Sequence, residues 1–384
     1  MKAEAEQEFY VSCPRGLEAV LAGELHELGY PNARASNAGV EVSGPFWLAY
    51  RINLSSRVAS RVLWRVAHGE YSSENDLYAA ALALPWDEWF EVGRTIAVKI
   101  DAQKSPLRSI DFATLKIKDA VCDKFRSQVG QRPDVSTHEP DIRIYAFLTA
   151  REYSLYLDTS GQPLFQRGYR RAGGEAPLRE NLAAGILRLA EWDPGEALLD
   201  PMCGSGTFVI EAALRALNIA PGIQRQFAFE KLRNFDSARW QDIRDAARNA
   251  ELPRMPLAIY GSDLYGSALK TAQENVAAAG LDEVIDLNQA NILEISAPAP
   301  SGVLVTNPPY GVRIGESAEL EQFYPALGDM LKKHFSDWRA YILSADMNLP
   351  KLIRLQASRR TPLFNGALEC RLFEYKIVAG SMRK

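Results

Sequence analysis

The spacing of apolar residues in the first part of the chain predicts short strands that alternate with amphipathic helices. Leucines three or four positions apart predict a helix over residues 15–28, and Gly29 follows where a helix-ending glycine is expected. Apolar runs predict strands over residues 9–13 and 39–42. Valines spaced by four predict another helix over residues 54–66. Short connections between these elements indicate a small α+β unit.

A second unit of strands and a helix follows. Residues 95–100 alternate as a strand, and residues 115–126 have the apolar spacing of an amphipathic helix. Two further strands are expected over residues 141–147 and 152–158, joined by a short turn. Residues 159–177 contain four glycines and two prolines and break every periodicity, which predicts a domain boundary there.

From residue 178 onward, helices alternate with apolar strands. This alternation predicts an α/β fold with a doubly wound, Rossmann-like parallel sheet. Asn365 and Gly366 lie between two apolar runs and predict a closing antiparallel hairpin at the C-terminal end. Helices are expected over residues 178–190, 207–216, 266–279 and 320–335, and strands over 197–199, 257–261, 302–306 and 340–344.

Composition narrows the class of protein. The four cysteines are far apart and form no C-x-x-C pair, and there are only four histidines, so no metal site is expected. The acidic N-terminal residues lack the apolar core of a signal peptide, and no run of 18 apolar residues occurs. We therefore expect a protein of the reducing cytoplasm with no membrane partner.

A glycine-rich turn after the strand at residues 197–199 is the first candidate for chemistry. No lysine follows Gly206, which excludes a phosphate-binding P-loop, and Val209 replaces the third glycine of a nicotinamide fingerprint. S-adenosylmethionine is the remaining ligand, and a tight turn with no ligand is the alternative. The candidate cofactor contacts in this turn are Asp200, Pro201, Cys203, Gly204, Ser205, Gly206 and Thr207.

Two polar residues at the ends of later strands extend this candidate site. Asp263 could accept hydrogen bonds from ribose hydroxyls, although an aspartate there could instead cap the next helix. Asn291 could meet the adenine amine of the cofactor, with a surface loop as the alternative.

The sequence Asn307-Pro308-Pro309-Tyr310, after an apolar strand, indicates the reaction. Oxygens of Asn307 and Pro308 could accept both hydrogens of an exocyclic amine, which returns lone-pair density to its nitrogen. Tyr310 would stack on the base, and catalysis would be positional and electrostatic. The alternative is a proline-rich loop without a catalytic role.

These motifs resemble a known family. Residues 200–207 and 307–311 resemble motifs I and IV of the amino-methyltransferases, and residues 166–170 with 176–183 resemble their motif X. The N-terminal half resembles a ferredoxin-like domain followed by a THUMP domain, an RNA-binding module, most clearly over residues 107–126. The whole chain resembles the bacterial 23S ribosomal RNA guanine-N2 methyltransferases of the RlmL type.

The resemblance implies a class I methyltransferase domain that uses S-adenosylmethionine to methylate guanine N2 in 23S ribosomal RNA, free or in an assembly intermediate. It implies a ferredoxin-like subdomain over residues 1–68, a THUMP domain over 69–160, a linker over 161–177 and the methyltransferase domain over 178–384. Asn291 stands where the family has an aspartate, and Tyr265-Gly266 replaces its usual Asp-Pro.

The net charge of the chain is −4, yet residues 94–132 contain nine Lys or Arg and four Asp. Local positive charge is what phosphate contacts need, and an ordinary solvated helix face is the alternative. Expected RNA contacts are Arg94, Lys99, Lys104, Arg108, Lys116, Lys118, Arg167, Arg170 and Arg171. Other open functions are the same chemistry on tRNA guanine N2 or DNA adenine N6, and RNA binding without catalysis.

Overall fold

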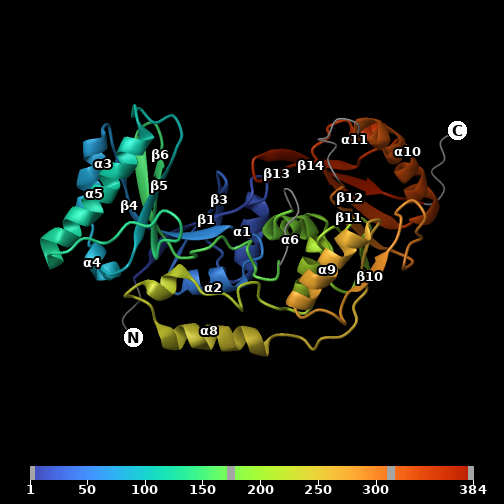
Figure 1. Cartoon of the computed structure of the whole chain (residues 1–384), viewed down its shortest axis with the longest axis horizontal. Coiled ribbons are helices and arrows are strands. Elements are labelled where there is room, and N and C mark those ends of the chain that lie inside the picture. The colour runs from blue at the N-terminus through green and yellow to red at the C-terminus, as the bar shows by residue number, and fades with distance from the viewer. Residues whose placement is uncertain (1–4, 171–177, 309–315, 379–384) are drawn as a thin grey trace. The chain divides into compact units, whose positions relative to one another are not determined.

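The computed structural model describes residues 5–170, 178–308 and 316–378, with side chains of the helix that begins at Glu316 described from residue 322 onward. The chain forms two compact units, each made of discontinuous segments (Figure 1). The first unit comprises Met1–Cys13, Ala22–Leu164 and Gln224–Ala246, and the second comprises Pro14–Leu21, Phe165–Ile223 and Ala247–Lys384.

The first unit is built on one seven-stranded sheet with the order β2-β3-β1-β4-β7-β6-β5. Neighbouring strands are antiparallel except for the parallel pair β5 and β6. The expected ferredoxin-like and THUMP regions share this sheet, and the boundary expected at residue 68 falls inside β4. The strands are β1 (Gln7–Ser12), β2 (Arg34–Ser36), β3 (Gly39–Gly44), β4 (Arg61–Glu70), β5 (Ile96–Ala102), β6 (Ile142–Leu148) and β7 (Glu152–Asp158).

The helix predicted over residues 54–66 is wrong, because helix α2 (Leu48–Ser55) ends near its start and strand β4 follows. The valine spacing of four that suggested a helix also fits the two-residue period of a strand. Pairing of β4 with β1 on one side and β7 on the other decides between the two. The helix predicted over residues 15–28 is confirmed as α1 (Glu18–Glu27), with Gly29 at a φ of 95° after it.

The helices of the first unit contribute buried aromatic side chains to its core, such as Trp86 and Phe125. Helix α5 (Ile110–Val129) begins after Ser109, whose hydroxyl accepts the N–H of Phe112, and ends before Gly130, which has a φ of 72°. The other helices of this part are α3 (Glu74–Leu82) and α4 (Trp86–Trp89).

A segment from the middle of the methyltransferase sequence belongs to the first unit. It contains the short helix η1 (Ala228–Lys231) and most of α8 (Ser237–Asn249). The ring of Phe229 lies 4.4 Å from the ring of Tyr50, between ring centroids. The Nζ atom of Lys231 lies 2.7 Å from a carboxylate oxygen of Asp141. Nothing local in residues 224–246 predicts this packing.

The second unit has the predicted doubly wound sheet, with the order β10-β9-β8-β11-β12-β14-β13. Its strands are parallel except for β14, which is antiparallel to both neighbours. Its strands are β8 (Leu198–Asp200), β9 (Ile259–Asp263), β10 (Asp286–Gln289), β11 (Gly302–Thr306), β12 (Trp338–Ser344), β13 (Arg359–Asn365) and β14 (Leu368–Lys376). Its helices are α6 (Glu180–Leu189), α7 (Thr207–Ala216), α9 (Gly266–Ala278), α10 (Glu316–His334) and α11 (Leu349–Leu352).

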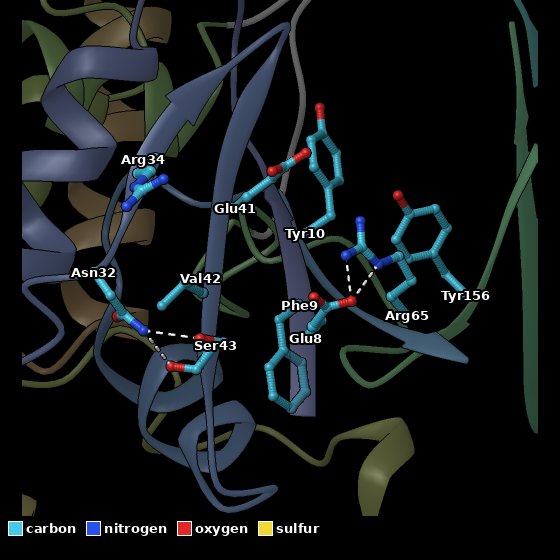
Figure 2. A pocket seen from close by; sticks show the side chains of 10 residues that line it. All are labelled: Glu8, Phe9, Tyr10, Asn32, Arg34, Glu41, Val42, Ser43, Arg65 and Tyr156. Atoms are coloured by element: carbon cyan, nitrogen blue, oxygen red, sulfur yellow. Dashed lines mark hydrogen bonds and ion pairs between the residues drawn. The ribbon is translucent and has the colours of Figure 1, made fainter. Parts of the chain in front are cut away.

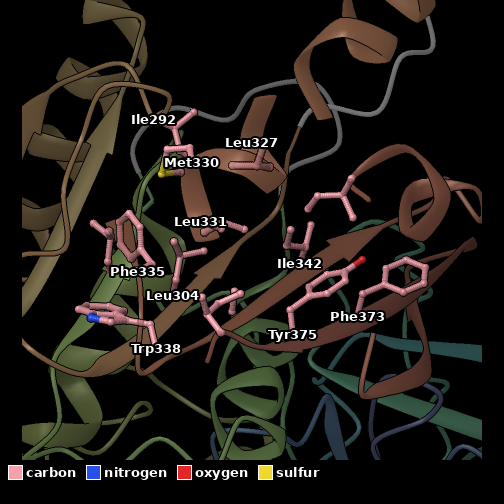
Figure 3. Close-up of a cluster of buried hydrophobic side chains, with 14 of the residues drawn as sticks. Ile292, Leu304, Leu327, Met330, Leu331, Phe335, Trp338, Ile342, Phe373 and Tyr375 are labelled. Carbon is pink, nitrogen blue, oxygen red and sulfur yellow. The ribbon is translucent and has the colours of Figure 1, made fainter. Parts of the chain in front are cut away.

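The predicted C-terminal hairpin is confirmed, with Gly366 in its turn at a φ of 67°. A buried apolar cluster fixes strand β11 between its neighbours and helix α10 (Figure 3). Leu304 and Ile342 of the sheet lie in this cluster with Leu331 of α10. A Cβ atom at Gly302 would lie 2.6 Å from the carbonyl oxygen of Ala197, so only glycine fits at the start of β11. This packing holds the end of β11, where the expected catalytic motif begins.

In the part of the chain that the structure describes, no helix combines the length and the apolar character needed to cross a membrane.

Candidate active site

A glycine-containing turn joins strand β8 to helix α7. Gly204 has a φ of 53° and Gly206 a φ of 79°, in the left-handed region that favours glycine. Gly206 is the N-cap residue of α7, and its N–H donates to the carbonyl of Cys203 at 2.8 Å. A Cβ atom added to Gly204 would meet no atom within 4 Å, so space lies beside the turn. This space leaves room for a ligand beside the backbone, and the cofactor contact expected of the turn stays a prediction.

Asp263 is the last residue of strand β9, the neighbour of β8, and its carboxylate forms a hydrogen bond with the glycine-containing turn. Its Oδ2 atom accepts the backbone N–H of Gly204 at 3.0 Å, and its Oδ1 atom accepts that of Tyr265 at 3.0 Å. The N-cap residue of α9 is Tyr265, so Asp263 is not the cap of that helix. Because a carboxylate offers about four lone-pair sites, capacity remains for two more donors.

Asp200 is the most strongly buried carboxylate at these strand ends, with 2% of its surface exposed. Burial raises its pKa to about 7, and the charge of Asp263 adds to this effect. The Thr306 side chain and the N–H of Met202, which is 3.3 Å from Oδ1, lower the pKa in part. Asp200 therefore sits near the midpoint of its titration at neutral pH and would ionise fully beside a cation.

Burial raises the pKa of the Cys203 thiol well above its usual range. The thiol therefore stays protonated, and Cys203 lines the turn as a small apolar group.

Strand β11 brings the expected catalytic motif to the same edge of the sheet. Parallel pairing places Leu304 of β11 beside Leu199 of β8, so both strands end at the carboxyl edge next to the turn. Asn307 is half-buried and Pro308 is buried. Pro309 and Tyr310, the rest of this motif, lie outside the described residues.

Asn291 follows strand β10 at this edge, and its amide makes local contacts. The oxygen accepts the N–H of Leu293 at 3.0 Å, and the nitrogen donates to Glu294 at 3.0 Å. These bonds stabilise a turn after β10. The adenine contact expected of Asn291 stays a prediction.

Arg170 ties the motif X region to the glycine-containing turn. Its guanidinium donates to Glu180 at 2.9 Å, to the Thr207 hydroxyl at 3.1 Å and to the Ser205 hydroxyl at 3.3 Å. The amide of Asn275 also donates to the Ser205 carbonyl at 2.9 Å. These hydrogen bonds hold the turn in place, so the observed role of Arg170 is to stabilise the local structure of the site.

Arg167 is buried, which differs from the RNA contact expected of it. Its side chain is 3% exposed, and its Nε and Nη2 atoms each lie 3.4 Å from an oxygen of Glu211. The hydroxyl of Tyr169 donates to the same carboxylate at 3.2 Å. A buried guanidinium needs a carboxylate partner, which Glu211 provides. The buried Arg167 side chain cannot reach a phosphate. Arg171 lies outside the described residues.

Three residues of this network, namely Glu180, Glu211 and Asn275, were not among the expected site residues. Each is a polar residue on an otherwise apolar helix face and is almost fully buried. That mismatch was the available signal, because a buried polar group requires a partner.

The basic segment places its cations in different surroundings. Lys104 and Arg108 are exposed in the loop before α5, while Arg94 is half-buried. Lys118 is paired with Asp119 at 2.7 Å. The Lys99 ammonium lies 5.8 Å from the centre of the Tyr145 ring, and Lys116 lies over aromatic rings in the same way.

Within residues 5–170, 178–308 and 316–378, no three His, Cys, Asp or Glu side chains gather as metal ligands.

The fold and the strand-end site define a methyltransferase domain, and comparison with known proteins gives its family. Residues 167–374 match the family model of the RMKL-like methyltransferase domain, residues 71–158 match the THUMP domain, and residues 8–63 match the RlmL ferredoxin-like domain. The chain belongs to the RMKL-like methyltransferase family.

Two similar curated proteins are both named ribosomal RNA large subunit methyltransferase K/L. The relative from Shewanella sp. strain W3-18-1 is 42% identical over 381 residues, which cover 98% of this chain and 54% of the relative. The relative from Aeromonas salmonicida strain A449 is 39% identical, with 98% of this chain and 55% of the relative covered. The chain thus spans about half the length of the curated relatives it matches.

Solved structures share the fold over nearly the whole chain. The protein SMU.472, crystallised with SAH, has a TM-score of 0.88 and 30% identity, with 98% of this chain and 99% of that chain covered. A predicted N6-adenine-specific DNA methylase from Listeria monocytogenes has a TM-score of 0.88 and 29% identity, with 97% of each chain covered.

Proposed function

We propose that this chain transfers a methyl group from S-adenosylmethionine to the exocyclic N2 of a guanine in 23S ribosomal RNA, in the cytoplasm. The proposal is carried by the neighbouring strands β9, β8 and β11, whose carboxyl ends at one sheet edge lead into Asp263, the glycine-containing turn and Asn307 in that order. The name of the similar proteins from Shewanella and Aeromonas and the THUMP match support ribosomal RNA as the substrate.

The residues present fit S-adenosylmethionine. Gly204 leaves space beside the turn, and Asp263 retains lone pairs for ribose hydroxyls after accepting two N–H groups. Asp200 is a buried carboxyl that would ionise beside the ammonium group of the donor's methionine part. When bound, the donor supplies an electrophilic methyl group on a positively charged sulfur.

The role of Asn307 and Pro308 is to bind and orient the target amine. The Asn307 oxygen accepts one N–H of the guanine amine and the Pro308 carbonyl accepts the other, so the nitrogen lone pair is less delocalised into the ring. With the donor bound beside the glycine-containing turn, Asn307 and Pro308 would hold guanine N2 with its lone pair available to the electrophilic methyl group. Tyr310 would stack on the base and hold it in the site.

A second candidate substrate is adenine N6 of DNA. The name of the similar Listeria protein favours it, and the same two acceptors would serve an adenine amine. Guanine N2 of tRNA would use the same chemistry.

Identification of the methylated nucleoside tests these substrates. The full chain is incubated with methyl-labelled S-adenosylmethionine and, separately, with 23S ribosomal RNA transcribed without modifications, with tRNA and with duplex DNA. The nucleic acids are then digested to nucleosides and resolved. We expect label in N2-methylguanosine from 23S ribosomal RNA. Label confined to N6-methyladenine in DNA, or to tRNA, would overturn the substrate assignment.

A further inference from the structure

The two faces of the seven-stranded sheet in the first unit carry different side chains. On one face the ring of Trp64 lies 5.1 Å from that of Phe46 and 5.2 Å from that of Trp89, between centroids, so this face belongs to the core. Side chains alternate along strands, so the opposite face presents the intervening residues. Cross-strand pairing aligns one row there from β3 to β5: Ser43, Glu8, Arg65, Tyr156, Tyr145 and Lys99.

A cavity of about 290 Å³ opens where this row meets a second one (Figure 2). In the second row Arg34 of β2 pairs with Glu41 of β3, and Glu41 pairs with Tyr10 of β1. The Tyr10 hydroxyl donates to the Asn37 carbonyl at 2.7 Å, which fixes the ring. The Tyr156 ring lies 6.1 Å from the Tyr10 ring, tilted by 51°. The cavity therefore offers an aromatic face beside a guanidinium and a carboxylate.

The charged groups of the cavity divide into a paired set and an available set. The Nε atom of Arg65 donates to the Glu8 carboxylate at 2.8 Å, so the charges of these two side chains are paired with each other. Burial raises the pKa of the Tyr156 hydroxyl, and the negative charge of Glu41 raises it further. Among the described residues, no side chain forms a hydrogen bond or ion pair with the exposed carboxylate of Glu41. Glu41 and the exposed Arg34 are therefore the groups that a ligand would meet.

We propose that this cavity binds an unstacked guanine base of the RNA substrate, apart from the methylation site. Guanine carries two adjacent donors, N1–H and the N2 amine, which a carboxylate such as Glu41 can accept in parallel. Its O6 oxygen accepts from a guanidinium such as Arg34. Tyr10 supplies the stacking face. Adenine has an acceptor at N1 and would repel the carboxylate, so the same groups select guanine.

The rest of the sheet face favours a base within an RNA strand over a free nucleotide. Beyond Tyr156 the same row continues to Tyr145, whose ring has the ammonium group of the exposed Lys99 at 5.8 Å. An aromatic ring beside an exposed cation suits a neighbouring nucleotide, because the base can stack on the ring and the phosphate is attracted by the cation. This proposal rests on the RNA substrate of the proposed function and adds a base-specific contact to it.

Binding of short RNA by the full chain tests this pocket. Fluorescence anisotropy at low salt compares a labelled oligouridine that contains one guanine with versions that contain inosine, which lacks the N2 amine, or adenine. Wild type should bind the guanine version about tenfold more tightly than either, the size expected when one bidentate base contact is lost. Glu41→Gln should remove this preference. Glu70→Gln, the same charge change at an exposed position of β4 outside the cavity, should retain it.

Each other outcome overturns a defined part of the proposal. Equal wild-type affinity for the three oligomers, or an intact preference in folded Glu41→Gln, overturns the guanine pocket. Guanosine monophosphate that competes as strongly as the guanine oligomer overturns the assignment to an RNA strand. Methylation of 23S ribosomal RNA by the same preparation separates the two proposals, because a wild type that methylates without preferring guanine oligomers loses only this pocket.

Discussion

The Oδ2 atom of Asp263 lies 3.0 Å from the backbone nitrogen of Gly204 and accepts its hydrogen bond, which joins the end of strand β9 to the turn after β8. The two residues are 59 positions apart in the chain. Their contact means that the carboxylate expected to bind the donor's ribose also fixes the turn that would surround the donor.

Replacing Asp263 with alanine should therefore weaken donor binding. The loss of charged hydrogen bonds corresponds to about 1.5–3 kcal/mol of binding free energy. Isothermal calorimetry with S-adenosylmethionine on the folded variant measures the change. Asp282→Ala, which removes an exposed aspartate before strand β10, is the matched control and should bind as wild type does. Unchanged affinity in Asp263→Ala would remove Asp263 from the donor site.

Donor affinity should depend on pH through Asp200, whose pKa is raised to about 7 by burial. The donor ammonium requires the ionised carboxylate, so below pH 7 binding must first remove a proton. The dissociation constant should rise by up to about tenfold for each pH unit below 7 and level off above it. Asp200→Asn should bind more weakly with no such dependence. Asp200 should titrate roughly between pH 6 and pH 8. A wild-type donor affinity that does not change over about that interval would contradict this role.

The same shift predicts how stability changes with pH. The pKa of Asp200 is higher in the folded chain than the ordinary value of 3.8, so between these values the folded state holds a proton that the unfolded state releases. The contribution of Asp200 to the unfolding free energy of the ligand-free protein is therefore present at low pH and is lost as pH rises toward 7. Relative to wild type, Asp200→Asn should gain stability over that interval. Denaturant unfolding at several pH values measures the difference in unfolding free energy between Asp200→Asn and wild type. A difference that does not change with pH would contradict the raised pKa of Asp200.

Arg167 should contribute to stability and leave RNA affinity unchanged. Replacing it with alanine leaves the buried Glu211 without its guanidinium partner, which costs about 3–5 kcal/mol of unfolding free energy. The double variant with Glu211→Gln should recover part of that loss. Chemical denaturation measures both variants. A stable Arg167→Ala variant with weakened RNA binding would restore the contact that the sequence first suggested.

Lys104 and Arg108 are exposed cations of the basic segment and should contact phosphates. The full chain with both Lys104→Ala and Arg108→Ala should bind RNA more weakly whatever the RNA sequence. Its dependence of log affinity on log salt should be shallower by about one or two units. Lys351→Ala, an exposed lysine of the second unit, is the control. The full chain is used because residues 224–246 form part of the first unit, which a fragment of residues 1–160 would lack.

The residues that position the site differ in how far local sequence could predict them. Helix α7 and strand β11 have the predicted bounds, because an apolar strand, a glycine turn and a helix are local signals. The helix expected over residues 54–66 failed because spacing by four fits two periods, and only sheet pairing decides between them. The partnership of Arg167 with Glu211 depends on long-range packing that no local pattern contains.

Single-turnover methylation of 23S ribosomal RNA by wild type and Asn307→Ala, at saturating donor, tests the central claim most directly. The Asn307 hydrogen bond to the amine should strengthen as positive charge develops on nitrogen, so its loss slows the chemical step. We predict a rate about 10²–10³-fold lower, as for removal of one preorganised group. Donor affinity should stay unchanged, and Asn348→Ala, at an exposed asparagine, should react as wild type does. Equal rates for wild type and Asn307→Ala would mean that the loop after β11 is structural and would contradict the proposed mechanism.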